Sequence, residues 1–213
     1  MFKDMATVYI VDDDASFRQS LERLLRTSGY TTQAFDSADA FLTQCSITHP
    51  ACLLLDVDLP EMDGISLQEK LVVQGSTLPI IFITGRGTIS MTVKAMKAGA
   101  IDFITKPFAR DTLFSAIEVA LEKDVQTLEK DVKKQKLQSL VDSLTPREME
   151  ILRWVIAGKP NKEIAYALGI AEKTVKIHRG HMMMKLKVSS VADLVRFTER
   201  AKLSPVESGS AVV

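Results

Sequence analysis

Residues 51–64 read ACLLLDVDLPEMDG, an apolar run that ends in the carboxylates of Asp56 and Asp58. The run from Ala51 to Leu55 has the length of a strand and is continuously apolar, which is typical of a parallel strand covered on both faces. Runs of the same kind recur along the first half of the chain, at Thr7–Val11, Thr31–Phe35, Pro79–Ile83 and Ile101–Ile104. We therefore expect several short, buried strands.

Amphipathic helical patterns separate these runs. In Ser16–Ser28 the apolar side chains fall on one face, and Gly29 follows as a helix stop. Strands that alternate with helices form a parallel sheet with right-handed crossovers, which places helices on both faces of the sheet. The pattern predicts an α/β fold, a flavodoxin-like doubly wound sheet with the strand order 2-1-3-4-5.

Acidic residues directly follow two of the predicted strands. Asp12, Asp13 and Asp14 come after the first strand, and Asp56 comes after the third. In the expected order these strands are neighbours, and their carboxyl ends face one crevice. Clustered carboxylates repel each other unless a hard cation neutralises them, and Mg²⁺ prefers such oxygen ligands. The sequence therefore predicts a magnesium site.

Two further polar side chains reach the same edge of the sheet, because Thr84 ends the fourth strand and Lys106 ends the fifth. A carboxylate cluster, a hydroxyl and an ammonium group at one edge indicate phosphoryl chemistry. Each motif alone has an ordinary structural explanation as a helix cap, a loop or a turn. Their combination at the ends of consecutive strands is specific.

Together these motifs resemble the receiver domain of two-component response regulators, over residues 5–123. The matching segments are Val11–Asp14, Leu55–Gly64, Ile83–Gly85 and Lys106–Phe108. The resemblance implies that Asp56 takes a phosphoryl group from the phosphohistidine of a partner kinase. It also implies that Lys106 contacts the acyl phosphate, that Thr84 moves to hydrogen-bond it, and that Phe103 turns inward in response.

The same resemblance assigns the magnesium ligands. Asp13 and Asp56 would bind the ion directly, with the main-chain carbonyl of Asp58, while Asp12 would hold a ligating water. The Lys106–Pro107 peptide bond is expected to be cis. A receiver is not an enzyme in the usual sense, although it assists its own aspartyl phosphorylation and dephosphorylation.

Two enzyme classes share parts of these motifs but fit less well. Asp56–Asp58 is similar to the start of haloacid-dehalogenase-type phosphatases, but that motif follows a first strand and continues to Thr or Val, where this chain has Pro60. Gly85–Gly87 begins like a dinucleotide-binding fingerprint, but Ser90 stands at its third glycine and no ribose-binding acid follows at the expected distance.

The helical pattern that starts at Asp111 continues beyond the expected end of the fifth unit, with neither Gly nor Pro before Pro146. Its apolar positions alternate four- and three-residue steps, with one step missed at Glu118, and are Phe114, Leu121, Val125, Leu128 and Val132. We expect one long helix that becomes a linker over residues 124–142. The linker is either a solvated spacer or a short coiled-coil seam that pairs two chains.

Residues 143–203 are helical by pattern and are predicted to form a small all-α domain of four helices. Thr145–Glu148 is a capping box with proline at the first helical position, and the helix that it opens stops at Gly158. Asn161 is expected to cap a second, short helix that ends at Gly169.

A third helix is expected from about Glu172 to Leu186 and a fourth from near Ser190, with a disordered tail over residues 204–213. A short helix, a tight turn containing glycine and a second helix are typical of a helix-turn-helix. The expected buried stripe of the third helix is Val175, His178, Met182 and Leu186. Its opposite face is Lys173, Lys176, Ile177, Gly180 and Met184.

The net charge of +0 conceals two halves of opposite sign. Residues 1–123 carry 16 acids and 11 bases, whereas residues 124–213 carry 11 acids and 16 bases. The helical domain is more basic still, with 12 bases against 6 acids over residues 143–202. A basic, exposed helix after a tight turn is the pattern of major-groove recognition.

This region resembles the LuxR/NarL-type DNA-binding domain through the segments Leu144–Glu148, Gly158–Ala165 and Thr174–Arg179. The order of receiver, helical linker and DNA-binding domain is most similar to the FixJ branch of these regulators. By this resemblance Lys176 and Ile177 would face base edges, while Lys162, Thr174 and Arg179 would contact phosphates. The helix pattern adds Lys173, on the exposed face of the same helix, as a further DNA-binding candidate.

The sequence thus predicts a phosphorylation-switched transcription factor. Its expected partners are a sensor histidine kinase, promoter DNA, RNA polymerase and, on phosphorylation, a second copy of the chain. The alternative is a phosphorelay module whose helical domain binds protein instead of DNA. Cys45 and Cys52 form no Cys-x-x-Cys pair, and no apolar run approaches the roughly 18–20 residues of a membrane span, so we expect a cytoplasmic protein without a membrane partner.

Overall fold

The computed structural model describes residues 6–86 and 88–206, which form two compact units that divide after Glu129. One helix, α5 (Arg110–Asp142), crosses this division, so the single long helix predicted from Asp111 onward is confirmed. The predicted domain start at residue 5 and most of the predicted disordered tail lie outside the described residues.

The first unit is built on a parallel sheet with the strand order β2-β1-β3-β4-β5, as predicted. The strands are β1 (Thr7–Val11), β2 (Thr31–Phe35), β3 (Ala51–Asp56), β4 (Ile80–Thr84) and β5 (Asp102–Thr105). The last two begin and end one residue later than the sequence pattern indicated. At the carboxyl end, main-chain pairing of Thr84 with Thr105 extends each strand by one residue, although neither side chain is apolar.

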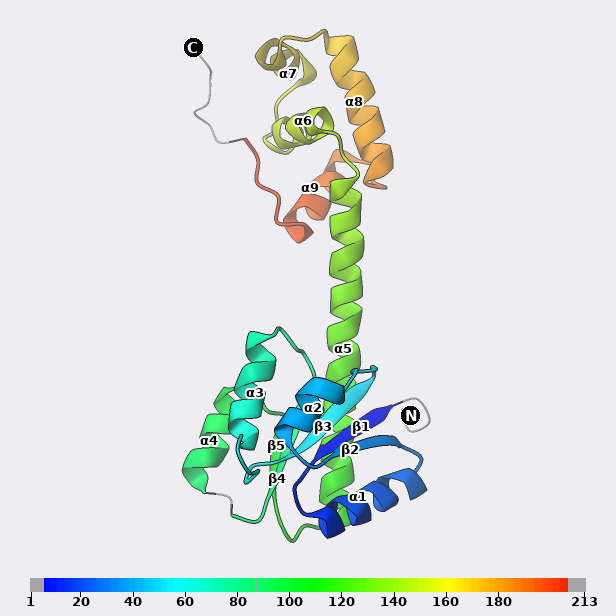
Figure 1. The fold of residues 1–213 in the computed structure, drawn as a ribbon. Helices are drawn as coiled ribbons and strands as arrows, with labels where there is room; N and C mark the ends of the chain where they lie inside the picture. Colours follow the sequence, from blue (N-terminus) through cyan, green and yellow to red (C-terminus); the bar gives the residue numbers. More distant parts are fainter. Residues whose placement is uncertain (1–5, 87, 207–213) are drawn as a thin grey trace. The chain divides into compact units, whose positions relative to one another are not determined.

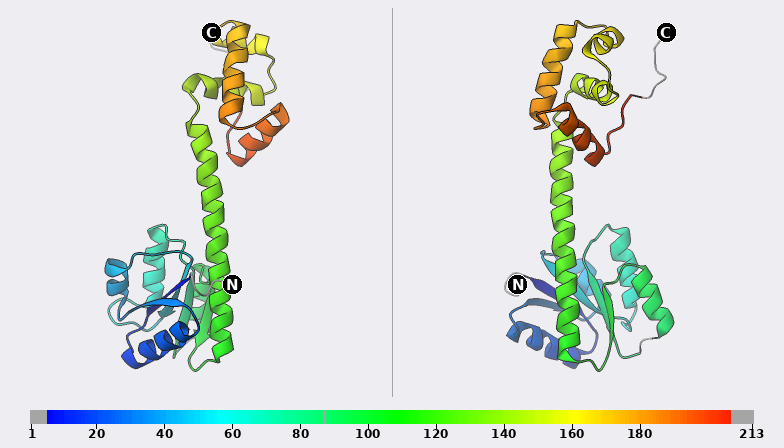
Figure 2. Two further views of the ribbon diagram at one scale, coloured as in Figure 1. Left: turned by 90° about the vertical axis from the view of Figure 1, so that its right-hand side faces the viewer. Right: turned by 180° about the vertical axis from the view of Figure 1, so that it is seen from behind.

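Helices cover both faces of this sheet. They are α1 (Ala15–Thr27), α2 (Ala38–Gln44), α3 (Gly64–Val73), α4 (Ile89–Lys97) and α5. Side-chain oxygens cap the first four by accepting main-chain N–H groups, and the capping residues are Asp14, Ser37, Asp63 and Thr88. The ribbon shows α2, α3 and α4 over one face, with α1 and α5 over the other (Figures 1 and 2).

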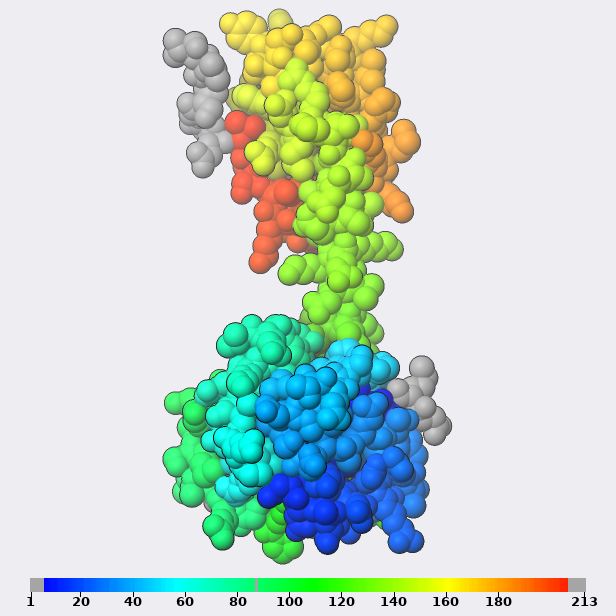
Figure 3. Space-filling view, in the orientation of Figure 1, coloured from blue at the N-terminus to red at the C-terminus, as the bar shows by residue number. Residues whose placement is uncertain are grey.

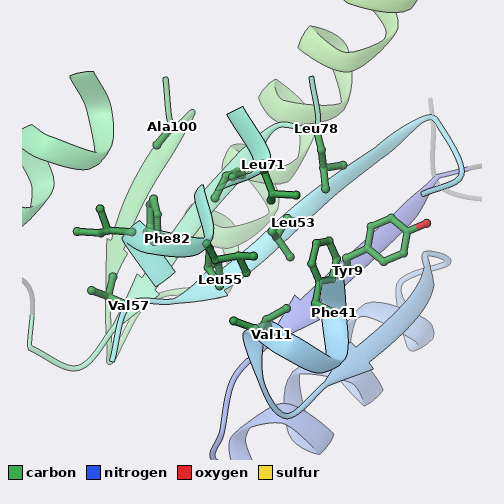
Figure 4. Close-up of a cluster of buried hydrophobic side chains, with 14 of the residues drawn as sticks. Tyr9, Val11, Phe41, Leu53, Leu55, Val57, Leu71, Leu78, Phe82 and Ala100 are labelled. Carbon is green, nitrogen blue, oxygen red and sulfur yellow. The ribbon is translucent and has the colours of Figure 1, made fainter. Parts of the chain in front are cut away.

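Alternate residues of the strands supply the two layers of core, as the period of a strand requires. Tyr9, Leu53 and Phe82 point toward α2 and α3, and the ring of Tyr9 meets that of Phe41 edge-on at 6.0 Å (Figure 4). The intervening residues, Ile10 among them, pack against α1 and α5. In the space-filling view the side chains of α2 and α3 cover this face of the sheet (Figure 3).

The second unit contains α6 (Pro146–Ile156), α7 (Asn161–Leu168), α8 (Glu172–Lys185) and α9 (Val191–Arg200) around a core of its own. The predicted capping box is present, since Thr145 and Glu148 satisfy each other's main-chain N–H groups. Gly169 ends α7 with φ +63°, a left-handed conformation that favours glycine, and this gives the tight turn into α8.

Two details of the predicted second unit are wrong. Asn161 does not cap α7, because Pro160 occupies the capping position and the Asn161 side chain instead accepts a hydrogen bond from Arg179. His178 is only half-buried, whereas Val175, Met182 and Leu186 do lie in the core.

Among the described residues, no helix combines the length and the apolar character that crossing a membrane requires.

Candidate functional site

The acidic residues at the carboxyl ends of β1 and β3 lie together, as the sequence predicted, and Asp56 is the last residue of β3. The pairing of Val11 with Leu55 places Asp12 and Asp56 at the same level of the sheet. Carboxylate oxygens of Asp12, Asp13 and Asp56 all lie within 4.8 Å of one another. Asp12 and Asp56 are buried and Asp13 is exposed, so the cluster opens to solvent on one side.

Lys106 brings the opposite charge to this cluster from the end of β5. Its Nζ donates to Asp12 Oδ2 at 2.7 Å and to Asp56 Oδ2 at 2.9 Å. Burial by itself lowers the pKa of Lys106, but the hydrogen bonds to both carboxylates outweigh burial and raise it. Burial raises the pKa of Asp12, and the lysine opposes that rise. One ammonium among three carboxylates leaves the cluster with excess negative charge.

Phe17 of α1 also contacts this lysine, a contact that the sequence motifs did not indicate. The Nζ of Lys106 lies 3.8 Å from the centroid of the Phe17 ring, within the range of a cation–π interaction. Phe108 packs edge-on against the same ring at 6.2 Å. In the sequence, Phe17 could be recognised only as an apolar residue on one face of a helix, which does not indicate a contact with Lys106.

The loops hold the two buried carboxylates through main-chain groups. The N–H of Asp14 donates to Asp12 Oδ1 at 2.9 Å, and the N–H of Asp58 donates to Asp56 Oδ1 at 3.1 Å. Gly64 allows the loop after β3 to fold closely, because a Cβ at this position would lie 2.2 Å from the main-chain oxygen of Asp56. Gly64 therefore has a steric role in building the site.

The predicted switch residues lie on neighbouring strands, Thr84 at the end of β4 and Phe103 within β5. Thr84 is fully buried, and its hydroxyl donates to Asp58 Oδ2 at 3.1 Å while accepting the N–H of Arg86 at 3.1 Å. Phe103 is half-buried and packs 6.0 Å from the ring of Phe82. The side-chain contact of Asp58 was missed, because the sequence motif assigned only its main-chain carbonyl.

The Lys106–Pro107 peptide bond is cis, as predicted, and the His49–Pro50 bond, for which no prediction was made, is cis as well.

The donor atoms of the cluster suit a hard divalent cation. Carboxylate oxygens are the ligands that Mg²⁺ prefers, and Asp12, Asp13 and Asp56 place theirs close enough to share one ion. The fit also follows from charge, since Lys106 alone does not balance three carboxylates. A nucleophilic carboxylate, a cation and a site for a second cation form a set suited to phosphoryl transfer.

In the second unit, α7, the turn at Gly169 and α8 form a helix-turn-helix. Lys173, Lys176 and Ile177 are exposed on α8, and Lys176 Nζ lies 3.2 Å from Glu172 Oε1. Ile177, beside these lysines on α8, retains 49% of its accessible surface.

The remaining predicted DNA contacts are less uniform. Lys162 is exposed on α7, and Thr174 is half-buried near the start of α8. Arg179 is half-buried, and its Nη1 donates to Asn161 Oδ1, so this side chain joins α8 to α7. The structure thus gives Arg179 a packing role that the sequence did not indicate.

Comparison with known proteins identifies the class. Residues 8–118 match the response regulator receiver domain, and residues 142–198 match the luxR family of bacterial regulatory proteins. The chain belongs to the response regulators, with an amino-terminal receiver domain and a carboxy-terminal LuxR-type DNA-binding domain. It is a transcription regulator and not an enzyme of the classical kind, and its class implies a sensor kinase and DNA as partners.

Individual relatives narrow the group to FixJ-like regulators, as predicted. The chain is 47% identical to response regulator protein TmoT of Ectopseudomonas mendocina over 92% of this chain and 90% of TmoT. It is 38% identical to the transcriptional regulatory protein FixJ of Bradyrhizobium diazoefficiens over 91% and 95% of the two chains. The solved structure of response regulator StyR matches with a TM-score of 0.83 at 46% identity, over 92% and 98%. These likenesses favour DNA binding over the protein-binding alternative.

Proposed function

We propose that Asp56 is the phosphoacceptor of this regulator, and that a sensor histidine kinase supplies the phosphoryl group. The observation that carries the proposal is the position of Asp56, buried at the end of β3 with one oxygen on Lys106 and with Asp12 and Asp13 beside it. An oxygen of Asp56 attacks phosphorus, the bond from phosphorus to the donor breaks, and the donor keeps that electron pair. The product is an aspartyl phosphate.

The residues fit a magnesium-dependent reaction. Asp13, Asp56 and the main-chain carbonyl of Asp58 would hold Mg²⁺, with Asp12 on a ligating water, and the ion would offset charge on the transferred group. Lys106 already forms an ion pair with Asp56, so its ammonium is in place to neutralise negative charge on the oxygens of the incoming phosphoryl group. With the same groups the receiver assists its own phosphorylation and the later hydrolysis of the aspartyl phosphate.

In the proposed active state, Thr84 and Phe103 change position in response to the phosphoryl group, and two chains associate as a homodimer.

The domains extend over residues 5–123 and 143–203, joined by the linker at 124–142. Lys176 and Ile177 face base edges, Lys173 supplies charge on the same face, and RNA polymerase is a further partner. Free Cys45 and Cys52 support a cytoplasmic setting.

The phosphate contacts are assigned to Lys162, Thr174 and Arg179. Exposure supports this role for Lys162, and the hydrogen bond from Arg179 to Asn161 leaves only part of that guanidinium for DNA.

The test of the phosphoacceptor is Mg²⁺-dependent labelling of the full chain with acetyl phosphate, followed by intact-mass measurement. We expect one added phosphoryl group on the wild type and none on Asp56→Asn. Asp63→Asn is the matched control, because Asp63 is an exposed carboxylate in the same loop that caps α3. Labelling of Asp56→Asn at the wild-type level would assign the phosphoryl group to another residue.

A further inference from the structure

We propose that the side chain of Asp58 is a positioning residue that holds the Thr84 hydroxyl away from the phosphoryl site until Asp56 is phosphorylated. The inference deepens the proposed function and rests on it, because it concerns the group that Thr84 must release. It assigns to the Asp58 carboxylate a role separate from that of its main-chain carbonyl.

The contact joins the end of β4 to the loop after β3, at the edge of the sheet where the acidic cluster lies. Thr84 ends β4 and is fully buried, whereas Asp58 lies in the loop after β3 and is exposed. The Thr84 hydroxyl donates to Asp58 Oδ2 at 3.1 Å, and the Asp58 N–H donates to Asp56 Oδ1 at 3.1 Å. One residue therefore contacts both the phosphoacceptor and the switch hydroxyl, through different groups.

A hydroxyl has a single proton to donate, so its hydrogen bonds exclude one another. While the Thr84 hydroxyl donates its hydrogen bond to Asp58, it cannot donate to an oxygen of a phosphoryl group on Asp56. The hydroxyl also accepts the N–H of Arg86 at 3.1 Å, which fixes its orientation from the other side. Phosphorylation must break the bond to Asp58 before Thr84 can donate to the new group.

The charge of Asp58 acts in the same direction. A carboxylate in this loop adds negative charge beside the position where a phosphoryl group arrives, and like charges disfavour each other. Because Asp58 is exposed, water solvates its carboxylate once Thr84 leaves, so the bond is reversible. Asp58 thus biases an equilibrium between two positions of Thr84, and the phosphoryl group shifts that equilibrium.

The test uses the full chain with Mg²⁺ and beryllium fluoride, a mimic of the phosphoryl group. We expect Asp58→Ala to bind the mimic about five-fold or more tightly than the wild type, since no bond to Thr84 is lost on binding. Asp58→Asn, which keeps an acceptor oxygen but no charge, is expected between the two. Glu61→Gln is the matched control, because Glu61 is an exposed acid of the same loop, and its affinity should equal that of the wild type.

A second measurement does not depend on phosphorylation. In NMR spectra without beryllium fluoride, Asp58→Ala should shift the resonances of Thr84 and Arg86, and Glu61→Gln should leave them in place. Unchanged resonances together with wild-type affinity for the mimic would overturn the positioning role. A wild type that neither binds the mimic nor takes a phosphoryl group from acetyl phosphate would instead overturn the phosphoacceptor.

Discussion

At the scale of single residues, Lys106 is the cation that offsets the negative charge of the acidic cluster when no metal ion is bound. Its ammonium bridges Asp12 and Asp56, both buried, at 2.7 and 2.9 Å. Removing one partner of a buried ion pair is more destabilising than the pair is stabilising, because the remaining charges lack compensation. Lys106 therefore contributes to the fold as well as to the proposed chemistry.

We expect Lys106→Met to lower the free energy of unfolding by about 1–3 kcal/mol in EDTA. Added Mg²⁺ should stabilise the variant more than the wild type, because the ion replaces the missing cation. Urea unfolding of the receiver, followed by NMR with and without Mg²⁺, measures both effects. Lys70→Met, at an exposed position of α3, is the control. Equal stability of both variants in EDTA would show that the bridge does not stabilise the fold.

Glu148 makes the second unit sensitive to acid. Burial raises the pKa of Glu148, but the Lys185 ammonium at 2.6 Å and the hydrogen bonds with Thr145 outweigh burial and lower it. A lowered folded-state pKa stabilises the fold above the unfolded-state pKa, about 4.3 for glutamate, and the stability is lost as pH falls through the folded value.

The expected result is a fall in stability of the second unit below about pH 4.3 that is smaller in Glu148→Gln than in the wild type. Urea unfolding monitored at Trp154, which lies in α6, reports this unit. Glu150→Gln, an exposed neighbour, should keep the wild-type pH dependence. Identical pH profiles for Glu148→Gln and the wild type would exclude Glu148 as the cause.

At the scale of elements, α5 is fixed to the sheet by a buried carboxylate. Asp124 is fully buried, its Oδ2 accepts the N–H of Ala51 at 2.8 Å, and the same oxygen lies 2.7 Å from Nδ1 of His49. Its Oδ1 has no hydrogen-bond partner among the described residues. The first residue of β3 is thus tied to a position on α5 beyond the end of the receiver match at residue 118.

Asp124→Ala should lower the free energy of unfolding of the receiver by about 1–3 kcal/mol, because the buried N–H of Ala51 loses its acceptor. Asp124→Asn retains an acceptor oxygen and should be less destabilised. Glu122→Ala, at an exposed position two residues earlier on α5, is the control. Chemical denaturation followed by amide NMR gives the comparison, and equal effects of Asp124→Ala and Glu122→Ala would contradict the anchoring role.

The sheet order and the acidic cluster could be predicted because each depends on a repeated pattern, apolar strands that end in polar residues. Asp124 and the side chain of Asp58 could not, since a single carboxylate in a charged helix or loop has no periodic signal and only tertiary packing buries or pairs it. Asn161 was assigned wrongly for a related reason. Its side chain is recruited by Arg179, 18 residues away, while Pro160 takes the capping position.

The two helices of the helix-turn-helix should affect DNA binding differently. Lys176→Ala on α8 should reduce sequence discrimination by about 1–3 kcal/mol, because a base-edge contact is lost. Lys162→Ala on α7 should weaken binding to all duplexes alike and reduce the salt slope by about one, because a phosphate contact is lost. Titrations of operator and random DNA at several salt concentrations separate these outcomes. A uniform loss for Lys176→Ala would reassign it to phosphate.

At the scale of the whole molecule, opposite charges serve two different ligands. The acidic first half, with 16 acids and 11 bases, contains the carboxylates that gather around the proposed phosphoryl site. The basic second half, with 16 bases and 11 acids, carries the exposed lysines of the helix-turn-helix. The neutral total is therefore uninformative about DNA binding, because long-range attraction to phosphates follows the local charge of a domain.

Phosphorylation is expected to convert the chain to a dimer, which doubles the molecular mass in solution. It should also raise the affinity for paired half-sites, because two linked DNA-binding domains bind with a higher effective concentration.

Val132, an apolar side chain of α5 that is 62% exposed, distinguishes the two interpretations of the linker. If residues 124–142 form a coiled-coil seam, Val132→Asp abolishes the dimer, since a buried carboxylate at the seam is unpaired. If they form a spacer, Val132→Asp dimerises like the wild type. Light scattering and operator titration with and without acetyl phosphate, with Asp56→Asn as the unphosphorylated control, decide between them. Full modification with unchanged mass and affinity would contradict phosphorylation-driven dimerisation.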